Sequence, residues 1–460
     1  MEIETKAPVI ISEQTIGNLV KTLDYIPGTY LLPIIRRALK GKLDVNSAIF
    51  SGNLIVTNAT IEVAGAPGRP VPFALFHKKV GGSLKLGRGV YNRLQEPAPA
   101  SPQLKGHRLG YVGLTPTKTD ELPAFKTVKL EVEPHNVVED KFQRPTEEVG
   151  GVYSYQVIAK GSKLRAQLRV RQSLLTQADE NWFAALDGGH SIGRSKKDDY
   201  GAVCVKVSVA NGSQTPTVQN NELTVWLLSD LLLRDERLRP TASVKRLAEV
   251  LGKELNVTLQ PRKSPDPKRA QVSRQHRTDS WHVGWGLPRP SLVGLAAGTC
   301  IVFDVTGTLT ETKLTQVEAT GLGERRAEGY GRLCFNDPLL TTEAKKRERV
   351  DVPSKDIPTP KPVKQGDLSF GYARLIEREA ARKEIQRCAI GVAAAPAQRK
   401  LALGIFVTSA DNSSKPKSQP QMSQLGALRS IVTRLQSNAD DEQRAKEKGQ
   451  VIQWLEQIEV

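Results

Sequence analysis

Apolar and polar positions follow two different periods along the chain, and these periods predict both strands and helices. Ala7–Ile11 and Leu223–Leu228 are short runs rich in apolar and β-branched residues, and each predicts the opening strand of one half of the chain. Apolar residues then recur every three or four positions over Leu31–Leu39 and over Ser243–Leu251, which predicts a helix in each half. Both halves therefore begin with a strand followed by a helix, and further strand-like segments follow.

A short segment occurs twice, and this internal repeat indicates two related units. Ile192–Cys204 aligns without a gap on Leu322–Cys334. Each copy begins with an apolar residue and glycine, continues through a charged run, and ends with Tyr-Gly and the start of a strand. With the strand and helix that open each half, this arrangement predicts an α+β fold of two tandem ferredoxin-like units with insertions, each following a βαββαβ plan.

Proline-rich stretches predict where the chain divides. We expect a first unit over residues 1–215 that contains an insertion, a second unit over 216–345, and a linker with a small helical C-terminal element over 346–460. The linker is Val350–Gly366, which carries four prolines among charged residues. Apolar residues at helical spacing over 425–435 and 451–458 predict the helices beyond it. The composition of Gly65–Lys126 indicates no function for this insertion-like stretch.

The charge of the chain favours a polyanionic partner. Lys and Arg number 66 against 49 Asp and Glu, which leaves a formal charge of +17. An otherwise ordinary basic enzyme remains an alternative at this point. The four cysteines are too far apart to form a paired-thiolate metal site, and they favour a reducing cytoplasm. The longest apolar run, Leu223–Leu233, is interrupted by Ser229 and Asp230, so neither a membrane span nor secretion is expected.

Both copies of the repeat form glycine loops, and glycine loops commonly hold phosphate. Neither copy has the spacing of a nucleotide-binding loop or of a dinucleotide fingerprint. Backbone N–H groups flanked by cations are instead suited to the phosphates of a polynucleotide. Two ordinary hairpin turns with solvated charges are the alternative. The candidate RNA-binding residues of the loops are Gly193, Arg194, Lys196, Lys197 and Gly201 in the first copy, and Gly323, Arg325, Arg326, Gly329, Gly331 and Arg332 in the second.

Three further groups could contact RNA. Strict alternation over Lys163–Arg171 predicts one strand with its cations on one face, or else a solvated edge strand. A basic loop before residue 281 adjoins tryptophans that could stack on unpaired bases or lie in the core. The predicted helix Leu31–Leu39 has a basic face. The candidates in these groups are Lys163, Arg165, Arg169 and Arg171 of the strand, Trp281 and Trp285 of the loop, and Arg36 and Arg37 of the helix.

Catalytic patterns are sparse. None of the six histidines forms a metal-ligand pair at helical spacing, so no metal site and no cofactor are expected. Asp24 is the candidate catalytic residue in an alternative where the chain cuts RNA, because it could help hold a divalent cation such as Mg²⁺ at a phosphate. A turn-stabilising aspartate is the competing interpretation. His190 precedes the first glycine loop and could act as a general acid or base, or be structural.

The motifs resemble a known superfamily. Gly321–Gly331 resembles the glycine-rich loop of the repeat-associated mysterious protein (RAMP) superfamily, and Ile26–Thr29 followed by a basic helix resembles the turn and helix after its first strand. Segments from both halves and the tail are similar to the large RAMP subunit of subtype III-D CRISPR effector complexes. These segments are Thr22–Gly28, Leu231–Asp235, Gly284–Pro288 with Ala297–Thr299, and Ser423–Arg429.

This resemblance implies a cytoplasmic ribonucleoprotein in antiviral defence. It implies RNA-recognition-like folds that bind the CRISPR RNA, contact neighbouring type III subunits and help present the guide to target RNA. Asp199 of the first loop departs from the pattern, since the second loop has Gly329 there. The segment before Ile26 is also shorter than in the RNA-cleaving subunits of the superfamily. An endoribonuclease that uses Asp24 and a scaffold without RNA contact remain the alternatives.

Overall fold

The computed structural model describes residues 1–80, 82–99, 103–116, 121–137, 151–175, 182–195, 199–210, 215–219, 221–279, 281–282, 286–345, 347 and 370–394. Contacts divide the chain into two compact parts, Met1–Pro353 and Ser354–Val460. In the second part the structure describes one helix, α6 (Phe370–Ala394). The predicted linker and the apolar segments beyond residue 394 lie outside the described residues. No helix in the described ranges is long and apolar enough to cross a membrane.

The second half of the first part is a ferredoxin-like unit. Its elements are β19 (Glu222–Leu227), α3 (Val244–Leu255), β22 (Thr258–Pro261), β28 (Cys300–Thr306), α4 (Glu311–Thr320) and β29 (Leu333–Phe335). The sheet has the antiparallel order β22-β28-β19-β29, which the βαββαβ plan requires, and both helices pack on one of its faces. The predictions for β19 and α3 are confirmed. Ser243 caps α3 by accepting from the Arg246 N–H, and Asn256 ends it in the left-handed conformation.

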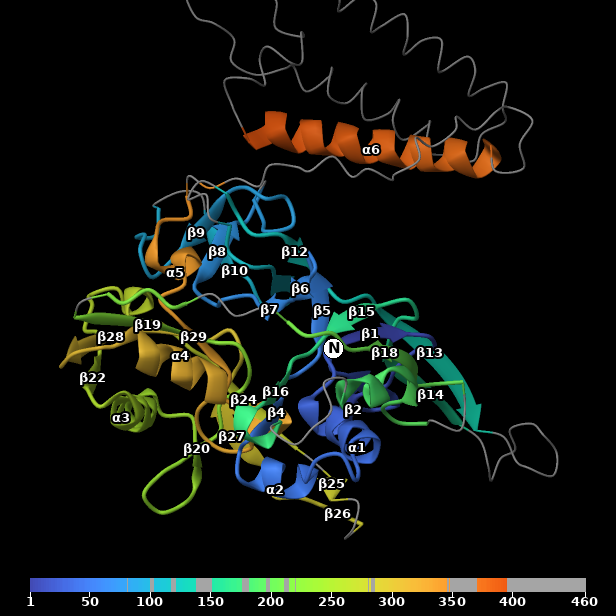
Figure 1. Cartoon of the computed structure of the whole chain (residues 1–460). Coiled ribbons are helices and arrows are strands. Elements are labelled where there is room, and N and C mark those ends of the chain that lie inside the picture. Colours follow the sequence, from blue (N-terminus) through green and yellow to red (C-terminus); the bar gives the residue numbers. More distant parts are fainter. Residues whose placement is uncertain are drawn as a thin grey trace, which may run out of the picture. The chain divides into compact units, whose positions relative to one another are not determined.

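The first half repeats this plan with one change (Figure 1). Its elements are β1 (Glu2–Thr5), α1 (Gly28–Ala38), β5 (Thr60–Val63), β15 (Lys163–Arg165) and β18 (Ala202–Lys206), with β6 (Ala66–Pro67) and β17 (Gly188–Ser191) at the sheet edges. The order β18-β1-β15-β5 matches that of the second unit. Where the second unit has α4, the described residues of the first unit form a short 3₁₀ turn, Trp182–Leu186. The predicted α+β fold of two tandem ferredoxin-like units is confirmed, and so is the helix α1.

The opening strand of the first unit differs from the prediction. Residues 7–11 form no strand and pair only through an isolated bridge between Val9 and Ile158, whereas the strand is β1, Glu2–Thr5. Pro8 has no N–H to give to a sheet, and the carbonyls of Pro8 and Ile10 accept from the first glycine loop. The apolar side chains of this segment nevertheless lie in the core, since Val9 and Ile11 are fully buried.

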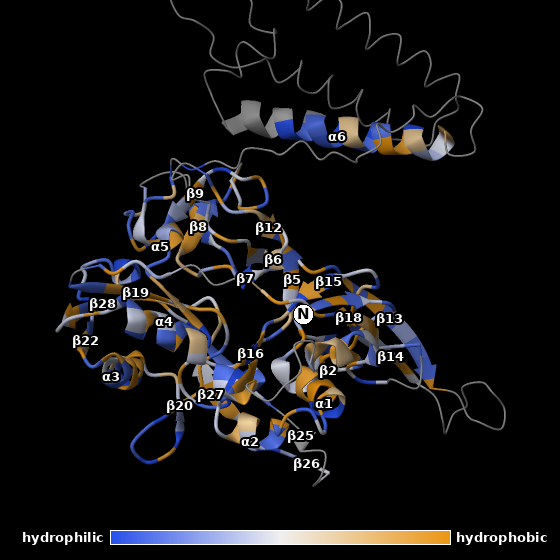
Figure 2. Ribbon diagram, viewed as in Figure 1, coloured by the Kyte–Doolittle hydropathy of each residue, from blue (hydrophilic) through white to orange (hydrophobic). Residues whose placement is uncertain are grey.

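A long hairpin and several short pairs of strands complete the first half. β13 (Leu130–Val137) and β14 (Gly151–Ile158) form the hairpin, which extends a sheet that also contains β3 (Leu19–Thr22) and β2 (Ser12–Ile16). Near α1 lie α2 (Val45–Phe50), β4 (Leu54–Val56) and β16 (Leu168–Val170). Figure 2 shows apolar residues concentrated on α1, α3 and the strands of both units, in agreement with the separate buried clusters.

The second unit also contains short strands outside the βαββαβ plan. They are β20 (Leu233–Arg234), β21 (Pro240–Thr241), β23 (Gln271–Val272), β24 (Gln275–Thr278), β25 (Trp281–His282), β26 (Leu287–Pro288) and β27 (Leu292–Leu295). β24 pairs with β27, and β25 pairs with β26. The short helix α5 (Pro338–Thr341) follows β29.

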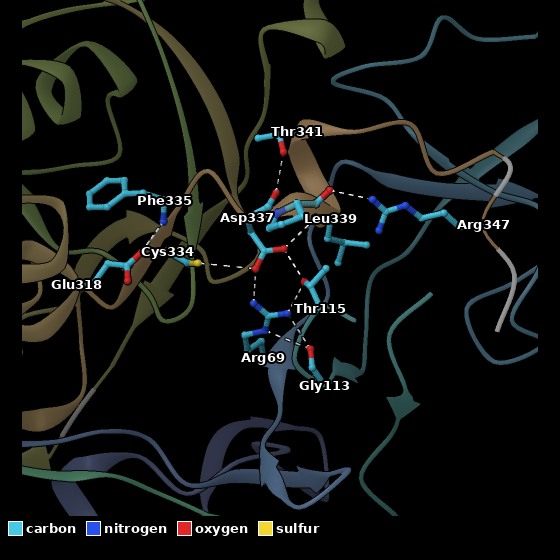
Figure 3. A network of polar contacts seen from close by, with 11 residues as sticks. Arg69, Gly113, Thr115, Glu318, Cys334, Phe335, Asp337, Leu339, Thr341 and Arg347 are labelled. Carbon is cyan, nitrogen blue, oxygen red and sulfur yellow. Dashed lines mark hydrogen bonds and ion pairs between the residues drawn. The ribbon is translucent and has the colours of Figure 1, made fainter. Parts of the chain in front are cut away.

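The insertion covers the outer face of the second unit's sheet. Its strands are β7 (Arg69–Pro70), β8 (Leu75–Lys78), β9 (Val90–Asn92), β10 (Leu104–Gly106), β11 (Tyr111–Val112) and β12 (Phe125–Lys126). Leu75, Val90 and Val112 pack in one buried cluster with Trp226 and Val302, which point away from α3 and α4. Buried polar contacts centred on Asp337 join the insertion to the second unit (Figure 3). The sheet face on which an RNA-recognition-like fold would offer a flat surface is therefore occupied in this unit.

Candidate nucleic-acid interface

The described ends of the two glycine loops share one hydrogen-bond pattern, which confirms the repeat at the level of single hydrogen bonds. Three donor–acceptor pairs recur in each loop. They are Ile192 N to Gly201 O (2.8 Å), Arg194 N to Ile10 O (3.0 Å) and Gly201 N to Pro8 O (2.8 Å) in the first, and Leu322 N to Gly331 O (2.9 Å), Glu324 N to Leu232 O (3.0 Å) and Gly331 N to Asp230 O (2.8 Å) in the second. Ser195 and Arg325 also share a left-handed φ of 55°.

The glycines of the repeat are required by close backbone packing. A Cβ on Gly201 would lie 2.3 Å from the carbonyl oxygen of Ile192, and a Cβ on Gly331 would lie 1.8 Å from that of Leu322. Both glycines also have positive φ, +80° and +70°. The N–H groups of Gly201, Gly331 and Arg194 already donate within the chain. These three donors therefore shape the loops and are not available to a ligand.

The second glycine loop docks on the Ile-Pro-Gly turn of the first unit. The Gly28 N–H donates to Asn58 Oδ1 at 3.1 Å, and Thr29 Oγ1 donates to Glu328 Oε2 at 3.2 Å. A Cβ on Gly329 would lie 2.5 Å from Asn58 Oδ1, whereas Asp199, its counterpart in the first loop, is exposed. Gly329 also has a φ of +95°, so its conformation and its contact with Asn58 both require glycine at this position of the second loop.

A cleft of about 1500 Å³ brings together the first glycine loop, the Ile-Pro-Gly turn, α1, β24 and the second glycine loop. This volume exceeds the usual range of about 300–1,000 Å³ for a small-molecule pocket, so an extended ligand fits it better. Cations outnumber anions among the residues that line it. The lining cations are Lys6, Arg37, Arg194, Arg277 and Arg325, and the lining carboxylates are Glu13 and Asp279.

Four predicted RNA-binding residues line this cleft, and their side chains differ in how they are held. Arg37 and Arg194 are exposed. Arg325 is half-buried, because it pairs with Glu328 at 2.5 Å and lies 4.8 Å from the ring centre of Tyr330. Gly193 provides backbone only. Among the predicted residues, Arg37 and Arg194 are therefore the cations best placed to meet a phosphate.

The expected basic strand over Lys163–Arg171 is wrong as a single element. β15 ends at Arg165 and β16 begins at Leu168, and the two strands belong to different sheets. Arg165 pairs with Glu62 (2.5 Å) and Glu2 (3.1 Å) on the outer face of the first sheet. Ala166 still pairs with Met1, the residue before β1, but the Gln167 N–H donates to Thr57 Oγ1, and from there the chain joins the other sheet.

Arg169 and Arg332 have structural contacts. Arg169 donates to the carbonyls of Glu318 (2.7 Å) and Ala319 (2.8 Å), near the C-terminal end of α4, where a cation is favourable. Burial lowers the pKa of Arg332 to about 9, and the charge of Arg169 acts in the same direction. Neither side chain lines the cleft.

The remaining candidates are dispersed. Four of them are exposed but do not line the cleft: Arg36, Lys163, Arg171 and Arg326. Lys196, Lys197 and Trp285 lie outside the described residues, and of Trp281 the structure describes only its place in β25. Gly201, Gly323, Gly329 and Gly331 serve the loop geometry and the docking contact described above, and their contact with RNA stays a prediction.

Asp24 is held by a neighbouring tyrosine. Its Oδ1 accepts from the Tyr111 hydroxyl at 2.8 Å, and burial raises its pKa. In the described part of the chain, no group of three or more His, Cys, Asp or Glu residues is arranged to hold a metal ion. His190 lines the cleft, with Nε2 2.9 Å from the carbonyl oxygen of Leu186.

The sequence patterns missed a histidine–aspartate pair beside the cleft. His276 Nδ1 lies 2.6 Å from Asp230 Oδ2, and Asp230 Oδ1 accepts from the Ala297 N–H at 2.8 Å. The other ring nitrogen, Nε2, lies 4.0 Å from Glu13 Oε1, and His276 lines the cleft. No local signal could have revealed the pair, because its members are far apart in the chain and meet only through the pairing of Leu231 with Leu295.

The pair raises the pKa of His276 above its ordinary value of 6.5, chiefly through the hydrogen bond to Asp230. The stability that this contact adds is complete below pH 6.5 and is lost as the pH rises through the raised pKa. We expect NMR titration of the imidazole to give a pKa above 6.5 and Asp230→Asn to lower it. His107 is the internal control, since burial lowers its pKa to about 4. A value for His276 at or below 6.5 would contradict the pairing.

No protein-family model and no curated protein matches the chain. Among solved structures, a chain of a Type III-B Cmr-beta complex bound to cognate target RNA and AMPPnP is similar, with a TM-score of 0.37, 9% identity, and coverage of 65% of this chain and 85% of that one. An RAMP protein binding different RNA substrates has a TM-score of 0.28 and 13% identity over 73% and 99% of the two chains. A Cas6 protein has a TM-score of 0.23 and 15% identity over 38% and 79%. At these values the similarities establish neither a family nor a function for this chain.

Proposed function

We propose that this chain is an RNA-binding subunit of a type III CRISPR effector complex, of the subtype III-D kind, and that it holds the sugar-phosphate backbone of the CRISPR RNA. The observation that carries the proposal is the cleft into which the structure gathers both glycine loops, the Ile-Pro-Gly turn and the cations Arg37 and Arg194. The motifs that resemble the RAMP superfamily therefore surround one cationic space rather than lying on unrelated surfaces.

Charge and shape favour a polynucleotide in this cleft over a small anion. The volume of about 1500 Å³ exceeds that of a small-anion site, and the cations lie on separate elements, α1 and the first glycine loop, as a chain of phosphates requires. The insertion covers the outer face of the second unit's sheet, so that face is not open to RNA. The cleft is therefore the better candidate for the RNA-binding site. The proposal assigns no cleavage step to Asp24, since Tyr111 holds its carboxylate and burial raises its pKa.

In the complex, the chain would present the guide to target RNA beside other type III subunits in the cytoplasm. Isolation of the complex from its host, followed by sequencing of the bound RNA and mapping of ultraviolet crosslinks, tests this role. We expect uniform repeat-derived RNA with crosslinks near Arg194 and Arg325. Recovery of the complex without RNA, or crosslinks that avoid the cleft, would favour the scaffold alternative.

Neutralising two exposed arginines of the cleft, Arg37 and Arg194, tests the site directly. The double variant Arg37→Gln with Arg194→Gln is expected to raise the Kd for a single-stranded RNA by about tenfold or more, because two phosphates lose their cations. Each lost contact should also reduce the magnitude of the slope of log K against log salt by about 0.7. Fluorescence anisotropy at several salt concentrations measures both quantities.

The matched control removes two exposed cations elsewhere on the second unit. Arg237→Gln with Lys253→Gln changes the net charge by the same amount, and neither residue lines the cleft. We expect this variant to keep most of the affinity and the salt slope. Equal losses in both double variants would mean that RNA responds to net charge alone and would overturn the cleft as the binding site.

A further inference from the structure

An aromatic cluster lies on one face of the β13–β14 hairpin beside the first glycine loop. The strand register places His135 opposite Tyr153 and Glu133 opposite Tyr155, so these side chains share a face. The ring of His135 stacks on that of Tyr153, with centroids 5.3 Å apart and planes at 16°. Tyr155 meets Tyr153 edge to face at 5.2 Å. We name the half-buried rings of His135, Tyr153 and Tyr155 the aromatic face.

Polar contacts at the base of the cluster hold these rings in place. The hydroxyl of Tyr200, which belongs to the first glycine loop, donates to Glu133 Oε2 and lies 2.7 Å from His135 Nε2. The ring of Tyr200 is nearly buried and meets that of Tyr155 edge to face at 6.1 Å. The rings of the aromatic face are thus held in place before a ligand arrives. Stacking of a base on them therefore costs the protein little side-chain entropy.

Arg194 connects the aromatic face to the cleft. Its guanidinium lies 5.8 Å from the ring centre of Tyr155, and the same residue lines the cleft. A strand whose phosphates contact Arg194 would therefore bring its bases next to the hairpin. Cations beside partly exposed aromatic rings are the arrangement by which proteins bind unpaired bases without reading their sequence.

We propose that the aromatic face is a stacking platform for unpaired bases of the RNA strand whose backbone passes Arg194. This inference rests on the proposed function and adds to it the state of the ligand, which is single-stranded over this segment. The platform recognises the flat faces of bases, so it tolerates any sequence but requires bases to be present and unpaired.

The test compares RNA strands with and without bases. Tyr153→Leu keeps apolar bulk on the hairpin but removes the ring, whereas Tyr153→Phe keeps the ring. We expect Tyr153→Leu to weaken binding of an intact single strand about tenfold and to leave binding of the same strand with abasic sites nearly unchanged. Tyr153→Phe should bind like the parent chain. Val152→Ala, which alters an exposed side chain on the opposite face of the hairpin, is the matched control.

The outcomes separate the platform from the proposed function. If the parent chain binds intact and abasic strands equally well, or if Tyr153→Leu weakens both equally, RNA binding stands and the platform is overturned. If the parent chain binds neither strand, the proposed function fails with it. The comparison of intact and abasic strands on the parent chain remains decisive even if Tyr153→Leu does not fold.

Discussion

Gly331→Ala is expected to lower the free energy of unfolding of the first compact part by roughly 3–5 kcal/mol, because the new Cβ would overlap backbone that cannot move. It would lie 1.8 Å from the Leu322 carbonyl oxygen, and the Leu322 N–H already donates to the Gly331 carbonyl. The Gly331 N–H is held by Asp230 O, so the loop cannot turn away without losing a second hydrogen bond. Urea unfolding of the full chain, followed by tryptophan fluorescence, measures the change.

Gly161→Ala is the matched control for this substitution. Gly161 has a similar positive φ, +80°, but a Cβ there meets nothing within 4 Å. Only the left-handed strain remains, which costs about 1–2 kcal/mol. Equal shifts of the urea midpoint for the two variants would show that conformation alone, and not the closure of the loop, makes Gly331 necessary.

Arg69→Met is expected to destabilise the first compact part by about 3–5 kcal/mol, because it leaves a buried carboxylate without its cation. Arg69 Nη1 contacts Asp337 Oδ2 at 2.5 Å, and Asp337 is only 5% exposed (Figure 3). Arg69 also donates to the carbonyl of Gly113 and lies 4.6 Å from the ring centre of Trp226. The loss should appear as a lower urea midpoint and as faster hydrogen exchange in β8 and β9 of the insertion.

The control for Arg69 is an arginine in a surface ion pair. Arg165→Met removes the contacts with Glu62 and Glu2, whose carboxylates are partly exposed, and should cost at most about 1 kcal/mol. If the two substitutions cost the same, or if exchange in the insertion does not change, the network around Asp337 does not hold the insertion on the second unit.

Prediction from sequence succeeded where the signal is local. The periods of α1, α3 and β19 lie within single segments, and each of these elements forms as expected. The glycine loops were found because their glycines are required by their own backbone closure. Prediction failed for residues 7–11 and for Lys163–Arg171, where apolar alternation is present but the backbone donors and acceptors are taken by the glycine loop and by Thr57.

The candidate site could be predicted only in part for the same reason. Arg37 and Arg194 were identified by charge and motif, and they do line one cleft. The same sequence signal marked three arginines that do not line the cleft. Arg165 pairs with a carboxylate, Arg169 donates to carbonyls at the end of a helix, and Arg332 is buried. Charge patterning cannot distinguish these cases, since the partners lie far away along the chain.

The amino-acid sequence alone was sufficient for the two-unit α+β plan, because a repeated motif and local periodicity require only neighbours along the chain. The tertiary structure decided which cations face the cleft, that the insertion covers the second sheet through the pair of Arg69 and Asp337, and that His276 meets Asp230. Each of these outcomes depends on which distant groups pair during packing. A buried polar or charged group without a partner costs free energy, so packing brings such groups together in pairs. The packed structure, and not the local pattern, therefore selects the partners.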